Sequence, residues 1–555
     1  MKYLIIPFLF IMTACSDGIT KTEAQSAGAT TSGTTSGTTS GTTLGTTLGT
    51  TLGTTSTDEP SADEIQWFSG DVGQAFLQAK EEGKPIFLYW GAVWCPPCQE
   101  IKQTVFKSRR FISLSESFIP IYLDGDTARA QAAGEQFGVK GYPTMIVFNS
   151  LGEEITRIPG GIDISKYNDI LAVSLNSIKP TSQLVEMVQA GSTTLTNADF
   201  QQLAYYSWGQ DQQALPEKYS PEIFLDMSNA SKEPLASARL YMQYLRAVAS
   251  STEAESRPVL VTEAMARVTE ILQNDVLTLA SWEYFAYYTQ EVLSVVVDVE
   301  SDPEGAAMFA DRWKTTMIRL SDSPSLSTAE QLAGFLPAIH FYYLEDETRE
   351  ISPEFKTQIL AAVRKADRAT RNSFARQSVV SQINYVLQSA HLVSEAKAIL
   401  LAELKKSTAP YYFMSSLSSI AENDGDDETA LDWRRKAYES SQGAATRFQW
   451  GANYVRTLIR LTPEDDKLIV TTAMKLLLDI DSEEDTFSGR NFRVLRSMTK
   501  SLRQWAEENA VADNNIEEEN TNSTGLIGSY NKFIETRCKA QESGTTALEN
   551  CATLI

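Results

Sequence analysis

The stretch Trp94-Cys95-Pro96-Pro97-Cys98 decides how the N-terminal part of this chain folds, because two cysteines at this spacing can cycle between a dithiol and a disulfide. An apolar run from Pro85 to Trp90 precedes it and predicts a buried strand, and residues 99–106 have the pattern of a helix. Cys95 is therefore expected at a helix N-terminus, where unpaired N–H groups and the helix dipole stabilise a thiolate. The thiolate is the form that attacks a disulfide.

Such a cysteine pair can also be half of a zinc site, which requires two further ligands nearby. The other cysteines and the histidines of the chain are far from the pair in sequence: Cys15, Cys538, Cys551, His340 and His391. We therefore expect redox chemistry at Cys95 and Cys98, with no metal and no cofactor.

Residues 64–178 resemble a thioredoxin-fold domain, because several motifs occur in the order found in that family. The strand, the Trp-Cys-x-x-Cys motif and the helix are followed by a second apolar strand at 118–124. The segment from Phe137 to Thr144, with the sequence FGVKGYPT, is similar to the family's φ-G-V-x-G-x-P-T segment, which leads into a further strand. The resemblance implies an α/β thioredoxin fold for this part of the chain.

The resemblance also implies roles for individual residues. Cys95 would be exposed and would attack a substrate disulfide, and the more buried Cys98 would then resolve the mixed disulfide. Pro143 would be the cis-proline that faces the cysteines, and the backbone of Tyr142 would pair with an extended substrate. Trp94 would shape the substrate surface, with a place in the core as the alternative.

Pro96 and Pro97 lie between the cysteines and are expected to support the active site. Pro97 matches the usual thioredoxin proline, whereas Pro96 replaces a glycine and removes a backbone N–H that could face the sulfur. Weaker thiolate stabilisation favours a reducing protein over a strong oxidant. Thioredoxins also carry a buried aspartate where this chain has Tyr89. The acceptor of the Cys98 proton is therefore water or one of three carboxylates: Asp124, Asp126 and Glu100.

Residues 1–14 have a basic start, a short apolar core and small residues before Cys15, which predicts a secretory signal peptide. Cys15 resembles the lipidated cysteine of a bacterial lipobox, with Met12 where leucine is commoner. The alternative is an ordinary signal peptide with an incidental cysteine. Ser16 favours the outer membrane by the sorting rule of such lipoproteins. No later stretch approaches the length of a membrane span, so we expect a lipid anchor alone, with the protein facing the periplasm.

Residues 15–63 contain Gly-Thr-Thr repeats between Gly28 and Thr55. Such a segment cannot bury enough apolar surface to offset its ordering entropy, and it predicts a flexible tether behind the lipidated cysteine. A glycosylated stalk is the alternative.

Residues 179–555 carry little strand signal and many amphipathic stretches, which predicts a large all-α region. Residues 429–438 resemble the second helix of a tetratricopeptide-type repeat, and residues 445–461 could open the next unit. No clean repeat consensus runs through the region, so we expect a helical solenoid or an irregular helical domain, with two subdomains on grounds of length. A concave helical surface could bind a protein client.

Cys538 and Cys551 are close together in sequence near the C-terminus. In an oxidising compartment two such thiols usually pair, and we expect a structural disulfide. The alternative is a second redox pair that relays electrons to Cys95 and Cys98.

The chain has 71 acidic and 48 basic residues and a net charge of −23. Such a surface repels nucleic acid, which is not expected as a partner.

Taken together, these features of the sequence predict an extracytoplasmic thiol-disulfide oxidoreductase that reduces or exchanges protein disulfides, with clients bound by the helical region. Its partners would be protein thiols or disulfides and an unidentified redox protein. The alternative is a helical protein-binding lipoprotein in which the thioredoxin domain is regulatory or a scaffold.

Overall fold

The computed structural model describes fourteen parts of the chain: residues 64–92, 95–139, 141–158, 164–176, 179–209, 220–251, 261, 263–298, 301–344, 346, 348–480, 486–510, 523–541 and 546–555. The predictions on the signal peptide, the tether, the lipidation of Cys15 and the place of Trp94 lie outside these residues. We call residues 64–176 the sheet domain and residues 179–555 the helical region.

The sheet domain is built on four strands, β1 (Ile86–Gly91), β2 (Ile119–Asp124), β3 (Thr144–Phe148) and β4 (Glu154–Ile158). Their order in the sheet is β2-β1-β3-β4. β2 runs parallel to β1, whereas β3 is antiparallel to both β1 and β4. β1 is buried along its whole length, which agrees with the apolar run that predicted it.

Helices cover both faces of this sheet: α1 (Val72–Glu82), α2 (Pro96–Gln103), α3 (Arg109–Ser115), α4 (Ala128–Gln136) and α5 (Ile164–Asn176). Successive side chains of a strand point to opposite faces. Phe87 and Tyr89 therefore share a core with both cysteines and with residues of α3 and α5. Ile86 and Leu88 instead join the core formed with α1 and α4. The cysteine pair lies at one end of this three-layer arrangement.

α2 begins at Pro96 and ends at Gln103, and so differs from the predicted helix over 99–106. Proline suits the first position of a helix because its missing N–H would have no intrahelical partner there. Beyond Gln103 the chain turns, and the amide of Phe106 donates to the carbonyl of Ile101 at 3.1 Å. This turn places Phe106 in the core.

Every regular element that the structure describes after β4 is a helix. These are, after α5, α6 (Thr181–Gln189), α7 (Asn197–Tyr205), α8 (Glu222–Ala230), α9 (Pro234–Ser251), α10 (Ala264–Gln273), α11 (Asp275–Ala280), α12 (Trp282–Tyr287), α13 (Thr289–Val296), α14 (Pro303–Leu320), α15 (Thr328–Ala333), α16 (Leu336–Leu344), α17 (Pro353–Ala369), α18 (Ser373–Ser389), α19 (Val393–Glu403), α20 (Tyr411–Asn423), α21 (Asp427–Ser440), α22 (Ala444–Leu461), α23 (Asp466–Asp479), α25 (Gly489–Ala510), α26 (Ser523–Lys539) and α27 (Thr546–Ala552).

The helical region has two main hydrophobic clusters, one drawn from residues 184–396 and one from residues 438–554. Along the second half of the chain, helices that are neighbours in sequence pack on one another, from α18 to α23. The match to tetratricopeptide repeats stays a prediction, since no finding tests it.

The helical region is joined to the sheet domain along β4. The hydroxyl of Thr181 and the side-chain amide of Gln202 both donate to the carbonyl of Ile155, at 2.7 and 2.5 Å. The hydroxyl of Tyr206 donates to Glu154 at 2.8 Å, and Tyr205 packs against the core that holds the cysteines. These contacts attach α6 and α7 to the sheet domain at β4.

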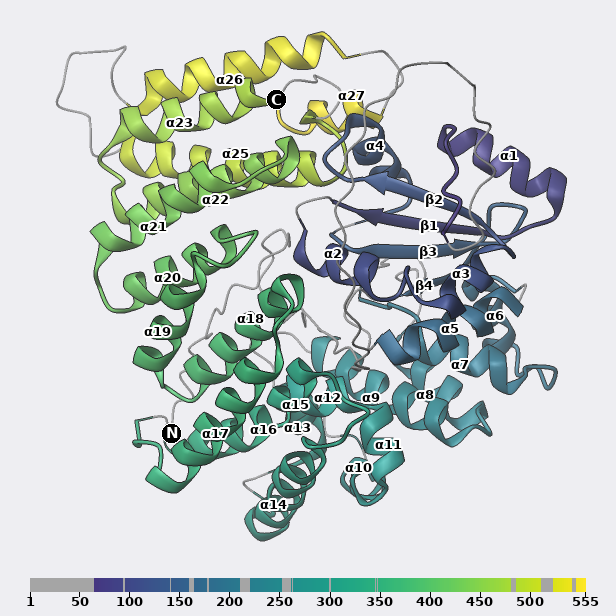
Figure 1. The fold of residues 1–555 in the computed structure, drawn as a ribbon. Helices are drawn as coiled ribbons and strands as arrows, with labels where there is room; N and C mark the ends of the chain where they lie inside the picture. The colour runs from purple at the N-terminus through teal and green to yellow at the C-terminus, as the bar shows by residue number, and fades with distance from the viewer. Residues whose placement is uncertain are drawn as a thin grey trace, which may run out of the picture.

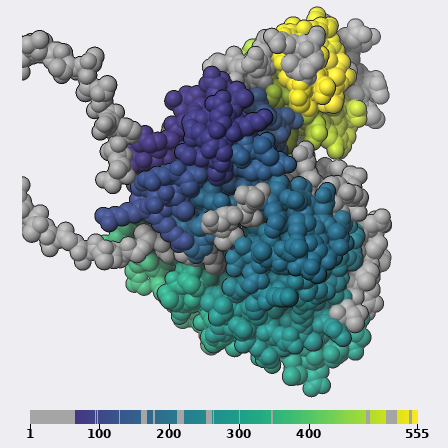
Figure 2. All heavy atoms as spheres, turned by 90° about the vertical axis from the view of Figure 1, so that its right-hand side faces the viewer, coloured from purple at the N-terminus to yellow at the C-terminus, as the bar shows by residue number. Residues whose placement is uncertain are grey.

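From this attachment the helices run in an arc that returns to the sheet domain at α4 (Figure 1). α18 packs on α2 and α25 packs on α4, so the inner side of the arc holds the end of the sheet domain that carries the cysteines. Figure 2 shows the sheet domain, in purple and blue, between the teal helices that follow it and the yellow C-terminal helices.

Candidate active site

Cys95 and Cys98 are joined by a disulfide, with their Cα atoms 5.2 Å apart. Cys95 precedes the first residue of α2, and its carbonyl accepts the first helical hydrogen bond, from the amide of Gln99 at 3.0 Å. Because Pro96 and Pro97 carry no N–H, the amide of Cys98 is the first donor of the helix. It points to Sγ of Cys95 at 3.3 Å. Negative charge that develops on this sulfur therefore faces an oriented N–H group.

The expectation that Cys95 is exposed was wrong. Its exposed fraction is 2%, against 0% for Cys98, so both cysteines are buried. The core around both cysteines is formed by sheet-domain residues together with Tyr205, and α18 packs against α2, which begins directly after Cys95.

Tyr89 occupies the place of the aspartate that thioredoxins carry beneath the cysteines. It is fully buried, and its hydroxyl donates to the carbonyl of Cys98 at 3.2 Å. Its ring stacks on Tyr122 with 5.6 Å between centroids and meets the ring of Phe106 edge-on at 4.8 Å. Burial raises the pKa of Tyr89 well above its usual range, so the phenol stays neutral and acts as a donor.

Two of the predicted proton acceptors lie at the end of β2. Asp124 is the last residue of this strand and pairs in register with Gly91. Burial, with the nearby charge of Asp124, raises the pKa of Asp126 to about 7, although Arg490 and a hydrogen bond from Thr446 oppose the shift. A carboxyl group with this pKa can exchange protons near neutral pH. The side chain of Glu100 lies outside the described residues.

Tyr142 and Pro143 are joined by a cis peptide bond, as the resemblance implied. The hydroxyl of Thr144 donates to the carbonyl of Gly141 at 2.8 Å and fixes the turn before β3. The ring of Tyr142 lies 4.5 Å from the ring of Trp90 between centroids. The predicted substrate-contacting loop is thus held against the sheet.

Sequence reasoning missed the residues of the helical region that reach this loop. The guanidinium carbon of Arg490 lies 4.7 Å from the ring centroid of Tyr142. The amide of Thr446 donates to Asp126 at 3.2 Å, and a guanidinium nitrogen of Arg490 lies 3.4 Å from the Thr446 hydroxyl. No local pattern singles out Thr446 or Arg490, because their role depends on how distant helices pack.

Cys538 and Cys551 are paired in the structure, with Cα atoms 5.6 Å apart. The pair joins α26 to α27 inside the second helical cluster, and neither cysteine belongs to the core that holds Cys95 and Cys98. The described residues contain no group of three or more histidine, cysteine, aspartate or glutamate side chains placed to hold a metal ion. None of their helices has the length and apolar character needed to cross a membrane.

Comparisons with known proteins agree with this geometry. The family model described as a thioredoxin-like domain matches residues 72–173. Nucleoredoxin from Mus musculus is 30% identical over 108 aligned residues, which cover 15% of this chain and 25% of that protein. The thiol:disulfide interchange protein DsbD from Yersinia pestis is 32% identical over 98 aligned residues, which cover 17% of this chain and 16% of that protein.

The chain thus spans a quarter or less of the length of these two relatives. The four-stranded sheet, the helices on both faces and the family match confirm the predicted fold class, an α/β domain followed by a large helical region. Residues 72–173 are therefore a thioredoxin-like domain, and Cys95 and Cys98 form its redox-active pair.

Proposed function

We propose that the protein is a thiol-disulfide oxidoreductase that acts on protein disulfides, with Cys95 as the nucleophile and Cys98 as the resolving cysteine. The observation that carries the proposal is the position of Sγ of Cys95 at the start of α2, 3.3 Å from the amide of Cys98. This position favours the thiolate at Cys95 over the thiolate at Cys98, whose sulfur lies within the helix. The names of the relatives, a thiol:disulfide interchange protein among them, support the same reaction.

The reaction transfers two electrons and two protons. The Cys95 thiolate attacks one sulfur of the substrate disulfide, a mixed disulfide forms, and the other substrate sulfur leaves as a thiolate that takes up a proton. The thiolate of Cys98 then attacks Sγ of Cys95, and the second substrate sulfur leaves and is protonated. The products are a substrate dithiol and the Cys95–Cys98 disulfide, which a dithiol donor reduces before the next cycle.

We propose that the pair works in the reducing direction. Related folds span potentials of roughly −270 to −120 mV, and strong oxidants owe their potential to a highly stabilised thiolate. Pro96 and Pro97 remove two N–H groups from the first turn of α2, so a single amide, that of Cys98, faces the sulfur. This limited stabilisation supports a reductant or an exchange catalyst.

We also propose that the protein is anchored by a lipid on Cys15 in a bacterial outer membrane and faces the periplasm. The signal-like residues 1–14 and the lipobox-like cysteine support this location. The helical region would take part in selecting protein clients. An unidentified redox protein would serve as the electron donor.

A trapping experiment tests the reaction. Cys98→Ala removes the resolving thiol, so protein disulfides attacked by Cys95 should accumulate as mixed disulfides that dithiothreitol releases. The double variant Cys95→Ala, Cys98→Ala is the matched control, because it keeps the fold and lacks the nucleophile. Equal amounts of trapped protein with both variants would refute Cys95 as the nucleophile.

A further inference from the structure

The helical region also meets the sheet domain at α2, at α4 and at the loop of Tyr142. The core that holds Cys95 and Cys98 contains buried residues only up to Leu171, and the core on the other face only up to Phe148. None of the described residues of α18, α22 or α25 belongs to either core. At α4, at Val139 and at Asp126 the contacts are hydrogen bonds, and polar contacts are typical of interfaces between domains that move.

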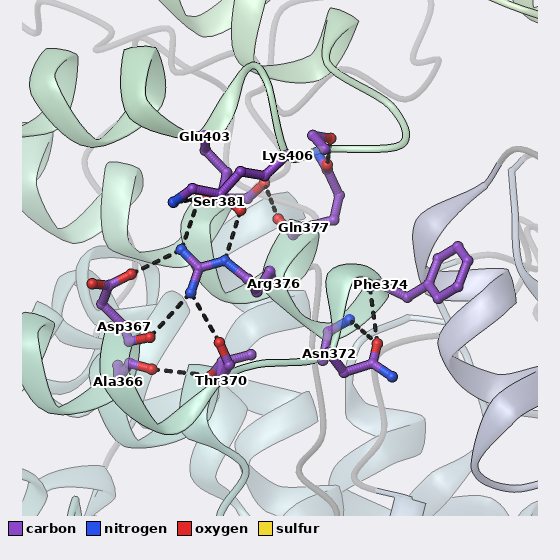
Figure 3. Close-up of polar contacts among 12 residues, drawn as sticks. Ala366, Asp367, Thr370, Asn372, Phe374, Arg376, Gln377, Ser381, Glu403 and Lys406 are labelled. Carbon is purple, nitrogen blue, oxygen red and sulfur yellow. Dashed lines mark hydrogen bonds and ion pairs between the residues drawn. The ribbon is translucent and has the colours of Figure 1, made fainter.

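The first of these contacts is between α18 and α2. Asn372 caps the start of α18 by accepting hydrogen bonds from the amides of Phe374 and Ala375, at 2.9 and 3.2 Å. In Figure 3 the ring of Phe374 points away from the helices toward the faint lavender ribbon of the sheet domain. Phe374 is half-buried and lies on the side of α18 that faces α2.

The start of α18 is held firmly by Arg376 (Figure 3). Its guanidinium makes two hydrogen bonds to the carboxylate of Glu403, at 2.6 and 2.7 Å. It also donates to the carboxylate and carbonyl of Asp367, at 2.8 and 3.0 Å, and to the carbonyl of Thr370 at 2.9 Å. All five guanidinium donors are therefore used, and α18 approaches α2 as a rigid element.

The second contact joins the start of α25 to α4. The amide of Gly489 donates to the carboxylate of Glu135 at 2.7 Å, and the amide of Arg490 donates to the side-chain carbonyl of Gln131 at 3.0 Å. The guanidinium of Arg493 donates to the carbonyl of Val139 at 3.0 Å. The start of α25 therefore docks on α4 through a small set of hydrogen bonds.

The third contact falls on the substrate side of the active site. Arg490 lies over the ring of Tyr142, and Thr446 holds Asp126. In the proposed reaction the thiolate sulfur of Cys95 must reach a sulfur of the substrate disulfide. With Cys95 2% exposed and Tyr142 contacted by Arg490, a folded protein disulfide cannot reach Sγ of Cys95 in this arrangement.

We propose that the helical region covers the redox pair and must move away from α2 and α4 before Cys95 can react with a protein disulfide. The inference rests on the proposed function for its biological sense, but the cover itself can be measured without turnover. The hydrogen bonds and packing along β4 stay in place, and the helical region pivots about that attachment. The regulated step is therefore access to Cys95, not the chemistry of the pair.

A substitution at Gly489 can disrupt the contact between the start of α25 and α4. Its φ is +53°, and a Cβ there would lie 2.6 Å from the backbone oxygen of Gln131 on α4. Gly489→Ala therefore drives the start of α25 away from α4. Gly425→Ala is the matched control, since its φ is +75° but no atom lies within 4 Å of the added Cβ. Both variants carry the backbone penalty of a left-handed alanine, and only one affects the contact.

The experiment uses the reduced full chain and measures the rate at which Cys95 reacts with iodoacetamide and with a maleimide that carries a polyethylene glycol chain. Peptide mass spectrometry assigns the label to Cys95. The large reagent should react about tenfold faster with Gly489→Ala than with the wild type, since hydrogen bonds to charged groups contribute roughly a factor of ten. The control should match the wild type, and the small reagent should distinguish the variants less.

Equal labelling rates with the large reagent for the wild type and Gly489→Ala would overturn the proposal that the helical region covers Cys95. If Gly489→Ala fails to fold, Glu135→Ala removes the acceptor of the Gly489 amide without a clash, and a rate unchanged from the wild type would overturn it equally. Failure of the proposed function looks different. Labelling would then respond to the variants as expected, while no variant reduced insulin with dithiothreitol as electron donor.

Discussion

The hydroxyl of Tyr89 donates a hydrogen bond to the backbone carbonyl of Cys98 at 3.2 Å. The bond ties the first turn of α2 to the central strand of the sheet, at the place where thioredoxins have a buried acid. A neutral phenol cannot take the proton of the resolving thiol in the way that a carboxylate does. Tyr89 therefore positions the cysteine helix, and the proton goes to another group.

Tyr89→Phe should separate positioning from proton transfer. The ring contacts with Tyr122 and Phe106 remain, and the loss of one buried hydrogen bond should lower the free energy of unfolding by about 1 kcal/mol. The pH profile of insulin reduction should keep its shape. Urea unfolding and turnover between pH 5 and 9, roughly the range in which thiols and carboxyls with shifted pKa values titrate, would measure the two effects. If turnover of the variant no longer fell on one side of the pH profile, Tyr89 would be the group that carries the proton.

Asp126 should make docking of the helical region depend on pH. Burial raises its pKa from 3.8 to about 7 and the charge of Asp124 at the end of β2 adds to the shift, whereas Arg490 of α25 and Thr446 of α22 oppose it. Tyr411 of α20 also lies within electrostatic range. Because the docked state binds the proton more tightly, docking is fully favoured below pH 3.8 and has weakened once the pH has risen through about 7.

The measurement is the labelling rate of Cys95 by the large maleimide, divided by the rate for the small reagent to remove the effect of thiolate ionisation. The ratio should rise between pH 5.5 and pH 7.5, roughly the upper part of the titration of Asp126. Asp126→Asn mimics the protonated carboxyl, so the ratio for this variant should stay low and should not change with pH. A ratio that rises equally in the variant would assign the effect to another group.

Arg376 should be important for stability, because it neutralises a buried carboxylate. The side chain of Glu403 is 4% exposed, and its hydrogen bonds to Arg376 hold the pKa of Glu403 below its usual range. Arg376→Ala leaves this buried charge with the longer contact to Lys406, at 3.4 Å, and should lower the free energy of unfolding by about 3 kcal/mol. Arg376→Met combined with Glu403→Met should recover part of the loss, since an apolar pair of similar volume often replaces a buried ion pair. Lys406→Ala, which removes the exposed partner of Glu403, should change stability by less than about 1 kcal/mol.

The disulfide between Cys538 and Cys551 should contribute to stability without taking part in catalysis. The two cysteines are 13 positions apart in sequence. Cys538→Ser combined with Cys551→Ser opens the loop between them and should lower the free energy of unfolding by roughly 3 kcal/mol on the chain-entropy model. Insulin turnover at a temperature where the variant is folded should equal that of the wild type. Loss of turnover in a folded variant would instead favour an electron relay between the two cysteine pairs.

The fold of the thioredoxin-like domain could be predicted because its signals are local. The apolar runs that became β1 and β2 predicted buried strands, and the paired cysteines predicted the start of α2 to within a few residues. The segment before Thr144 indicated the loop that carries the cis peptide bond. In each case neighbouring residues determine the structure, so the pattern is visible in the sequence.

The surroundings of Cys95 could not be predicted because they depend on long-range packing. Thr446 and Asp126 are 320 positions apart in sequence, and Glu135 and Gly489 are 354 apart. Helical periodicity indicates that α22 and α25 form, but it does not indicate where they return to the sheet domain. The departure at Tyr89 was visible in the sequence, whereas its bond to Cys98 required the position of the carbonyl.

Reduction of insulin by the full-length protein, with dithiothreitol as electron donor, is the most direct test of the central claim. The wild type should accelerate precipitation of the insulin B chain over dithiothreitol alone, Gly489→Ala should accelerate it further, and Cys95→Ser should abolish the effect. No acceleration by either the wild type or Gly489→Ala, with Cys95 shown to be reduced, would contradict a thiol-disulfide oxidoreductase that acts on protein disulfides through Cys95 and Cys98.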